Sequence, residues 1–180
     1  PSEPETLPSA GSGDIHLGPL NVKGGPKYDL ERLVACGGMG AIYKTHDITC
    51  ERVVALKMLR QNPSEPLPPN SRKLFIDEAQ ITSQLEHPNI VPIHELGSDE
   101  AGNAFYTMKY IRGISLSEII TSLRQSGDPA IVEQYPLGRL LTIFQKTCDA
   151  VAFAHSKGII HRDLKPGNIM IGDYVEVLVL

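Results

Sequence analysis

Cysteine is scarce in this chain of 180 residues, which contains only three. Cys36, Cys50 and Cys148 lie far apart and are odd in number, so they do not form a disulfide framework. No two of them have the spacing of a metal site. A reducing compartment is therefore the default expectation. We expect a cytoplasmic location. The parent protein could also be anchored to a membrane, with this part on the cytoplasmic side.

Long apolar runs are also absent. No stretch approaches the roughly 18 residues that a membrane-spanning helix needs. The most apolar stretch, residues 137–160, is interrupted by Arg139, Lys146 and Asp149. We therefore expect no membrane contact within this chain. The first residue is Pro1 and not Met, so we expect the sequence to be part of a longer protein.

A strong charge of one sign is missing as well. The net charge is −4, and 41% hydrophobic with 21% charged residues is the composition of an ordinary globular protein. Such a balance gives no electrostatic footprint for nucleic acid, so we expect no nucleic-acid partner. The length suits one large domain, or one and a half small ones.

The first part of the chain divides into a polar segment and a strand-rich segment. Residues 1–26 are rich in proline, glycine and serine and predict a flexible linker, because they cannot bury enough apolar surface to offset chain entropy. Residues 27–113 predict a mostly antiparallel sheet with one helix. The expected strands are 28–34, 41–46, 52–59, 90–96 and 104–111, and the expected helix is 71–85.

After residue 113 the pattern becomes helical. Ser115 and Glu118 have the spacing of a capping box that opens a helix. A second helix is expected over 136–156, ended by Gly158, and a strand over 175–180. The apolar stripe that defines the second helix comprises Leu137, Leu141, Phe144, Cys148, Val151 and His155.

Three short motifs bear on chemistry, and the first is ACGGMGAIYK. Gly37 and Gly40 lie there between two strand-like runs. Glycine allows a tight turn and a close approach of backbone amides to phosphate oxygens. A plain hairpin loop explains the same pattern, so this motif alone leaves phosphate binding open.

The second motif is VALK, which places Lys57 in a strand that we expect to be largely buried. An edge lysine that reaches solvent is the ordinary explanation. The following helix favours a different one. Its apolar stripe, with steps of four, three and four residues, comprises Leu74, Glu78, Ile81 and Leu85. A carboxylate in such a stripe is costly unless it is paired, and Lys57 is its expected partner. A glutamate near the solvent edge of the helix is the alternative.

The third motif is IIHRDLKPGN, a loop after the long helix. Asp163 can orient a hydroxyl group and accept its proton, and Lys165 can neutralise a migrating phosphoryl group. Asn168 offers a neutral oxygen to Mg²⁺, a cation that prefers oxygen ligands. A polar turn is the alternative, but the spacing of the three residues favours phosphoryl-transfer chemistry.

In this order, AxGGMGxIYK, VALK, a helical glutamate and HRDLKPGN resemble the signature set of the eukaryotic-type Ser/Thr protein kinases. The phrases EAQITSQLEHPNIVPIHELG and HRDLKPGNIMIG are most similar to bacterial members. The resemblance covers residues 28–180 and implies an α+β, protein-kinase-like fold. A complete small antiparallel-sheet lobe with the hinge is expected over 27–113. An incomplete helical large lobe, with two helices, the catalytic loop and the following strands, is expected over 114–180.

The resemblance also implies ATP and Mg²⁺ as cofactors and a protein substrate bearing Ser or Thr. Asp163 is the implied catalytic base, Lys165 the charge stabiliser, which favours Ser/Thr over Tyr acceptors, and Asn168 a Mg²⁺ ligand. Lys57 is implied to contact the α- and β-phosphates, held by Glu78. The other implied ATP-binding residues are Ala35, Gly37, Gly38 and Gly40 in the phosphate loop, Ile42, Ala55 and Met170 around adenine, Met108 as gatekeeper, and the backbone of Lys109 and Ile111 in the hinge.

The sequence departs from the family pattern in the phosphate loop. Ala35 replaces the first glycine there, and alanine resists positive φ, so we expect a stiffer loop. Cys36 is either an incidental loop residue or a redox-sensitive thiol, and the sequence places no basic residue beside it.

A second Mg²⁺ ligand, the Asp of Asp-Phe-Gly, is expected directly after Leu180. We therefore expect the 180 residues alone to have no phosphotransferase activity. We also expect them to expose apolar surface on the helix over 136–156.

Two other functions compete with that of an active kinase. One is a nucleotide-binding pseudokinase or a truncated, non-catalytic chain, which the residues encoded after Leu180 would distinguish. The other is a small-molecule phosphotransferase of the aminoglycoside-kinase type, which shares H-x-D-x-x-x-x-N but is disfavoured by GGMG, VALK and Lys165. For the parent protein, a dimer or additional sensor domains stay open.

Overall fold

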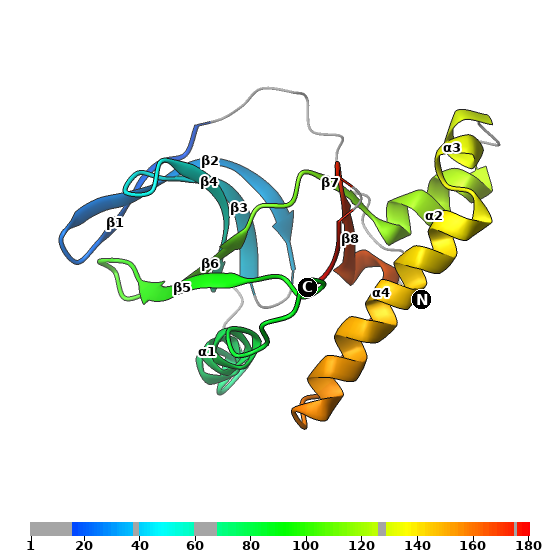
Figure 1. Ribbon diagram of the computed structural model, residues 1–180. Coiled ribbons are helices and arrows are strands. Elements are labelled where there is room, and N and C mark those ends of the chain that lie inside the picture. Colours follow the sequence, from blue (N-terminus) through cyan, green and yellow to red (C-terminus); the bar gives the residue numbers. More distant parts are fainter. Residues whose placement is uncertain (1–15, 38–39, 60–67, 126–128, 175) are drawn as a thin grey trace, which may run out of the picture.

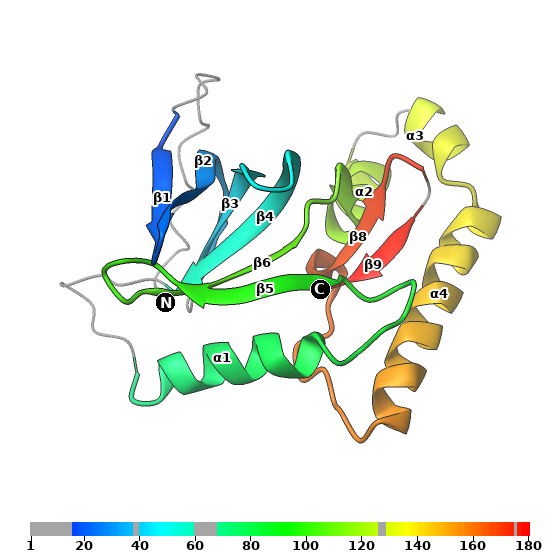
Figure 2. The ribbon, with the colours of Figure 1, turned by 60° about the vertical axis from the view of Figure 1, so that its left-hand side comes forward.

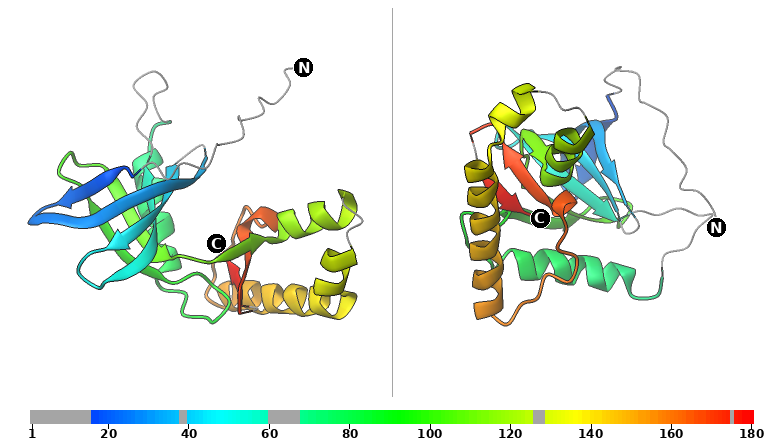
Figure 3. Two further views of the ribbon diagram at one scale, coloured as in Figure 1. Left: turned by 90° about the horizontal axis from the view of Figure 1, so that it is seen from above. Right: turned by 90° about the vertical axis from the view of Figure 1, so that its right-hand side faces the viewer.

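The computed structural model describes residues 16–37, 40–59, 68–125, 129–174 and 176–180, which form two lobes (Figure 1). The small lobe is a curled sheet with one helix against it, and the large lobe combines helices with a three-stranded sheet. Residues 110–112 lead the chain from the last paired strand of the small lobe into the large lobe, as the left view of Figure 3 shows. The expected α+β, protein-kinase-like architecture is confirmed.

The small-lobe sheet is antiparallel throughout, and its strands lie in the order β1-β2-β3-β4-β6-β5. A bridge between Val22, at the end of β1, and Asp99, just after β5, joins the two outer strands, so the sheet curls almost into a barrel. The strands are β1 (Gly18–Val22), β2 (Gly25–Cys36), β3 (Gly40–Asp47), β4 (Arg52–Leu59), β5 (Ile93–Ser98) and β6 (Ala104–Lys109).

Alternation along the strands gives this sheet two apolar faces. Side chains such as Val54 and Leu56 point into the curl and pack with Tyr28 and Phe105. Ala55 and Leu59 point to the other face, where they pack against helix α1 (Ser71–Thr82). The sheet therefore has a core inside its curl and a second core under the helix, and Lys57 lies on the helix face.

The first strand corrects the linker prediction. Residues 1–15 lie outside the described part, but Gly18–Val22 forms β1 and β2 begins at Gly25, so a linker through residue 26 is wrong for residues 18–26. Leu20 is buried inside the curl, and the backbone of β1 pairs with β2. Composition misled here because two apolar side chains, Leu20 and Val22, bury enough surface to order a short hairpin once they pack inside the curled sheet.

The large lobe begins with a strand and two short helices. These are β7 (Gly113–Ser115), α2 (Leu116–Gln125) and α3 (Pro129–Gln134), and α3 is additional to the two expected helices. The predicted capping box is present: Ser115 Oγ accepts from the Glu118 amide, and the Glu118 carboxylate accepts from the Ser115 amide at 2.7 Å.

The long helix α4 (Leu137–Ser156) follows, and then η1 (Pro166–Asn168), β8 (Ile169–Gly172) and β9 (Val177–Val179). Gly158, at φ +76°, ends α4 with a Schellman motif, in which its amide and that of Ile159 bond to the carbonyls of His155 and Ala154. The second sheet has the order β7-β8-β9. None of the described helices is long and apolar enough to cross a bilayer.

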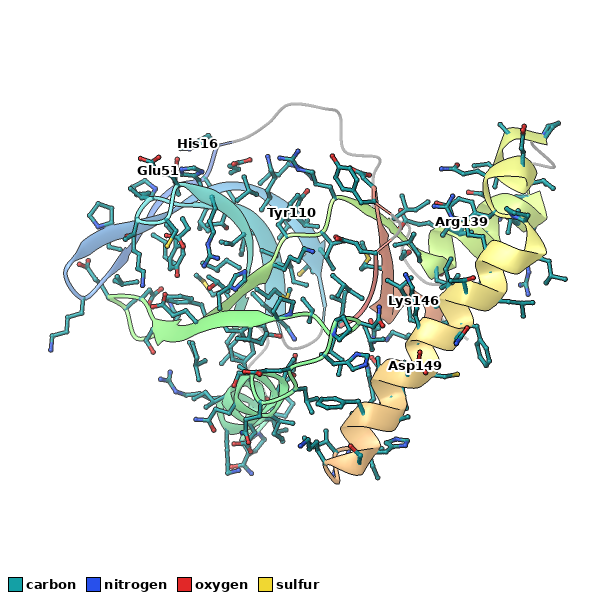
Figure 4. The ribbon with its side chains drawn as sticks, viewed as in Figure 1. His16, Glu51, Tyr110, Arg139, Lys146 and Asp149 are labelled. Atoms are coloured by element: carbon teal, nitrogen blue, oxygen red, sulfur yellow. The ribbon has the colours of Figure 1, made fainter. Side chains whose placement is uncertain are left out.

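The predicted apolar stripe of α4 faces solvent. Leu137, Leu141 and Phe144 are 71%, 56% and 67% exposed. The helix instead packs through a second face that sequence reasoning missed, with smaller residues on it: Ile143, Thr147, Ala150 and Ala154. The expectation of exposed apolar surface on this helix is therefore confirmed. Figure 4 labels along the same helix the charged residues Arg139, Lys146 and Asp149.

A second connection between the lobes holds β9 in place. The segment before β5 runs beside β9, where the Val91 amide donates to the Val179 carbonyl at 3.0 Å and the Val179 amide to the Asn89 carbonyl at 2.9 Å. The Asn89 side chain donates to the Val177 carbonyl at 2.8 Å. Strand β9, the second strand after the HRDLKPGN loop, is thus fixed against the small lobe by backbone bonds.

One close backbone approach makes a testable stability prediction. A Cβ atom on Gly113 would lie 2.0 Å from the Ile171 carbonyl oxygen in the β7–β8 pair. Gly113→Ala is therefore expected to lower the free energy of unfolding by about 3 kcal/mol, measured by urea denaturation. Gly138→Ala is the control, because its Cβ meets nothing within 4 Å in helix α4 and should stabilise by up to about 1 kcal/mol. Equal midpoints for both variants would contradict the prediction.

Candidate active site

The predicted pair between Lys57 and Glu78 is formed. Lys57 Nζ lies 2.7 Å from Glu78 Oε1, with the lysine side chain 17% and the glutamate side chain 38% exposed. The hydroxyl of Tyr106, on the neighbouring strand β6, donates to the same oxygen at 2.7 Å. The lysine ammonium also lies 5.4 Å and 5.7 Å from the ring centroids of Tyr106 and Phe75. Two strands and one helix therefore fix the position of one ammonium group.

The electrostatics of this cluster are clearest at Tyr106. Burial raises the pKa of its hydroxyl, and the negative charge of Glu78 raises that pKa further. Sequence reasoning missed this residue, because only the β4–β6 register shows that Tyr106 is the direct partner of Lys57.

The apolar stripe of helix α1, from which the Lys57–Glu78 pair was predicted, is wrong. Leu74 and Ile81 are exposed, and α1 buries Phe75 and Ala79 instead. Glu78 follows Phe75 by three residues, so it lies at the edge of the buried face and still reaches the sheet. The prediction of the Lys57–Glu78 pair is still correct, because a residue at the edge of the buried helix face can also reach the sheet.

The glycine motif lies between β2 and β3. The Gly37 amide donates to the Gly40 carbonyl at 2.9 Å, which ties the end of β2 to the start of β3. A Cβ on Gly40 would lie 2.8 Å from the Met58 carbonyl, so only glycine allows this approach of β3 to β4. Gly38 lies outside the described residues. Ala35 pairs with Ile42 in strand β2 and is not at positive φ, so its backbone does not need the glycine that the family pattern has there.

The residues expected around adenine lie mostly on the helix face of the small-lobe sheet. Ala55 and Met108 are direct partners across β4 and β6, and Ile42 and Ile111 pack against the same cluster. Met170 lies apart from this cluster, half-buried on β8 between Ser115 and Leu178.

The expected hinge begins where β6 ends. Lys109 is the last residue of β6, and its ammonium lies 3.0 Å from the carboxylate of Glu176, in the turn before β9. Tyr110, labelled in Figure 4 at the link between the lobes, accepts from Arg32 of β2 at 3.4 Å. The start of the link is therefore bonded to β2 through Tyr110 and to the large lobe through Lys109. Sequence reasoning missed both contacts.

The HRDLKPGN loop brings its three expected residues together. Lys165 Nζ lies 2.8 Å from Asp163 Oδ2, and Asn168 Nδ2 donates to the Asp163 carbonyl at 2.8 Å and to Oδ2 at 3.1 Å. These bonds from Lys165 and then Asn168 hold the pKa of Asp163 below its usual range. The carboxylate is exposed and ionised, as a group that accepts a proton during reaction must be.

The same bonds decide how the Asn168 amide is turned. Because its nitrogen donates to Asp163, its oxygen faces away and is a free neutral ligand position as far as the described residues show. Such an oxygen, beside an ionised carboxylate, is a donor set that suits Mg²⁺.

The backbone under this loop is also fixed. Arg162 has φ +66°, and His161 Nε2 lies 2.8 Å from the Leu180 carbonyl oxygen while its Nδ1 accepts from the Asp163 amide at 3.3 Å. The Leu180 amide in turn donates to the Asn168 carbonyl at 2.9 Å. The imidazole thus ties the loop to the end of β9.

Comparisons with known proteins agree with this arrangement. Residues 28–178 match the sequence model of the protein kinase domain family. The serine/threonine-protein kinase PknD of Chlamydia muridarum is 42% identical over 156 residues, covering 86% of this chain and 16% of that protein. PknD of Chlamydia trachomatis serovar L2 is 43% identical over 159 residues, with the same coverage. The chain thus spans about a sixth of the length of these relatives.

Solved structures show the same fold. The PknI kinase domain of Mycobacterium tuberculosis superposes with a TM-score of 0.66 at 27% identity, covering 85% of this chain and 57% of that one. A second PknI structure covers 95% of this chain and 62% of that one, with a TM-score of 0.65 at 26% identity. With the family match over residues 28–178, these similarities show that the chain belongs to the protein kinase domain family.

Proposed function

We propose that the protein containing these residues is a Ser/Thr protein kinase that transfers the γ-phosphoryl group of ATP to protein hydroxyls. The observation that carries the proposal is the Asp163 carboxylate held by Lys165 and Asn168 in one loop. The relatives named serine/threonine-protein kinases, at 42% and 43% identity, support it.

Each residue of the nucleotide site has a role in this proposal. Lys57, held by Glu78 and Tyr106, contacts the α- and β-phosphates. The Gly37–Gly40 turn, with Ala35 before it, covers the phosphates with backbone amides. The proposed adenine contacts are Ile42, Ala55, Met108 and Met170, with backbone bonds from Lys109 and Ile111.

The loop supplies the chemistry on the acceptor side. The ionised Asp163 orients the substrate hydroxyl and accepts its proton, and Lys165 balances the charge on the phosphoryl group that moves. Asn168 offers its outward oxygen to Mg²⁺, which neutralises phosphate charge when bound.

The proposal is tested with the full-length protein, ATP–Mg²⁺ and a mixture of peptides containing Ser, Thr or Tyr. Labelled phosphate is expected on Ser and Thr and not on Tyr. Phosphate on an aminoglycoside, or none on any peptide while the nucleotide binds, would overturn it in favour of the two competing functions. Residues 1–180 alone are expected to transfer no phosphate.

The location proposed for this domain is cytoplasmic. An ATP-dependent site needs a nucleotide pool, and the three cysteines are exposed and free of disulfides, as a reducing compartment favours.

A further inference from the structure

Helix α1 carries Glu78 but begins weakly. Its N-cap residue, Asn70, has φ +72° and makes no capping bond with its side chain, and the first turn contains no acidic residue. Arg72 and Lys73 place two positive charges in that turn, near the positive end of the helix dipole. The start of the helix therefore depends on contacts with other segments of the chain.

Arg72 supplies one such contact. Its guanidinium donates to the Gly102 carbonyl at 2.7 Å, 30 positions away in the β5–β6 turn. In Figure 2 the first turn of α1 and the β5–β6 turn lie at the same end of the small lobe. Lys73, the next residue, pairs with Asp77 of the same helix, the one partner found for it among the described residues.

The β5–β6 turn is rigid enough to serve as an anchor. The Asp99 carboxylate accepts from the amide and from the side chain of Asn103, each at 2.7 Å. The Asp99 amide donates to the Asn103 carbonyl, and the Gly102 amide to the Asp99 carbonyl, both at 3.0 Å. One aspartate thus closes the whole turn and fixes the carbonyl that Arg72 uses.

Strand β1 holds the same turn from its other side. Val22 forms a bridge with Asp99, and the Glu100 amide donates to the Asn21 carbonyl at 3.1 Å. A continuous set of bonds therefore runs from β1 through the turn to Arg72 and along α1 to Glu78 and Lys57.

We propose that Arg72 is a positioning residue, which holds α1 through the Asp99-closed turn and so places Glu78 against Lys57. Its effect on catalysis rests on the proposed kinase function, whereas its effect on the helix does not. Strand β1 belongs to this device, so the chain that precedes the kinase-like region contributes to the placement of the lysine ammonium.

Hydrogen exchange measured by mass spectrometry tests the helix directly, in the full-length protein and without any need for activity. Arg72→Met is expected to speed amide exchange in residues 71–82 by about 3-fold to 10-fold, because a charge-assisted bond is lost from a weak helix start. Lys73→Met is the matched control, with the same change one residue away, and should leave those rates within about 2-fold. Equal rates for the two variants would overturn the proposal.

Two further measurements separate positioning from general stability. Asp99→Ala should speed exchange in α1 as well, and the double variant with Arg72→Met should add little, since both break one connection. In kinase assays, Arg72→Met should lower kcat and leave KM for the peptide unchanged, with partial rescue by Arg72→Lys. Additive effects of Asp99→Ala and Arg72→Met on exchange, or no rescue of kcat by Arg72→Lys, would contradict the positioning role of Arg72. A wild-type protein that transfers no phosphate would refute the kinase function and leave the exchange result standing.

Discussion

Asp163→Asn in the full-length protein is expected to lower kcat for peptide phosphorylation by about 10³-fold while ATP–Mg²⁺ affinity changes little. The substitution removes the proposed acceptor of the hydroxyl proton and keeps the shape of the side chain. Asparagine can still accept from Asn168 and Lys165, so the loop should keep its form. Initial rates with a Ser peptide and calorimetric titration with nucleotide measure the two quantities separately.

Asp173→Asn is the control. This exposed aspartate in the β8–β9 turn engages its neighbours only through its backbone amide among the bonds found in the described residues.

The pH profile of the phosphorylation rate gives a second check on Asp163. Because Lys165 holds the pKa of Asp163 below its usual range, the wild-type base stays ionised as pH falls toward that range. In Lys165→Met its protonation, and the loss of rate, should begin at higher pH. An Asp163→Asn variant with near-normal kcat would refute the assigned base.

The second large effect is expected at Lys57. Lys57→Met should lower kcat/KM for ATP at least about 100-fold, because it removes the ammonium group that two strands and a helix hold in place and that we propose to bind the phosphates. It also leaves the Glu78 carboxylate with Tyr106 as its remaining donor among those described. Steady-state kinetics and nucleotide titration measure the loss.

Lys44→Met is the matched control for Lys57. Lys44 lies on the adjacent strand β3 and also pairs with a glutamate, Glu31, with both side chains partly buried. A generic weakening of the small lobe would affect both variants alike. If Lys44→Met lost as much activity as Lys57→Met, the phosphate-binding role of Lys57 would be wrong.

Sequence patterns predicted the sheet well where strands are short, alternating and bounded by turn residues. The strand over 52–59 was placed at its observed bounds, and the residues of HRDLKPGN lie together because their spacing is local. A loop of eight residues leaves little freedom for its own side chains. The resemblance to the kinase family then supplied the overall arrangement, which local patterns do not contain.

The helix faces could not be predicted in the same way. On α4, large residues such as Phe144 defined the stripe, but the helix packs through Thr147 and Ala150, which let it approach β9 closely. Periodicity shows that a helix is amphipathic and not which partner it meets. Strand β1 was missed for a related reason, since Leu20 is buried only because the sheet curls around it.

The second donor on Glu78 has a consequence for the rotamer of that side chain. Because burial and the nearby carboxylate raise the pKa of Tyr106, its phenol stays protonated and keeps donating to Glu78 Oε1. That oxygen accepts from Lys57 and from Tyr106 at once, so a turn of the carboxylate away from the sheet would break both bonds. In the proposed kinase, the ammonium of Lys57 would then remain on Glu78 and reach phosphate oxygens with its other two donors.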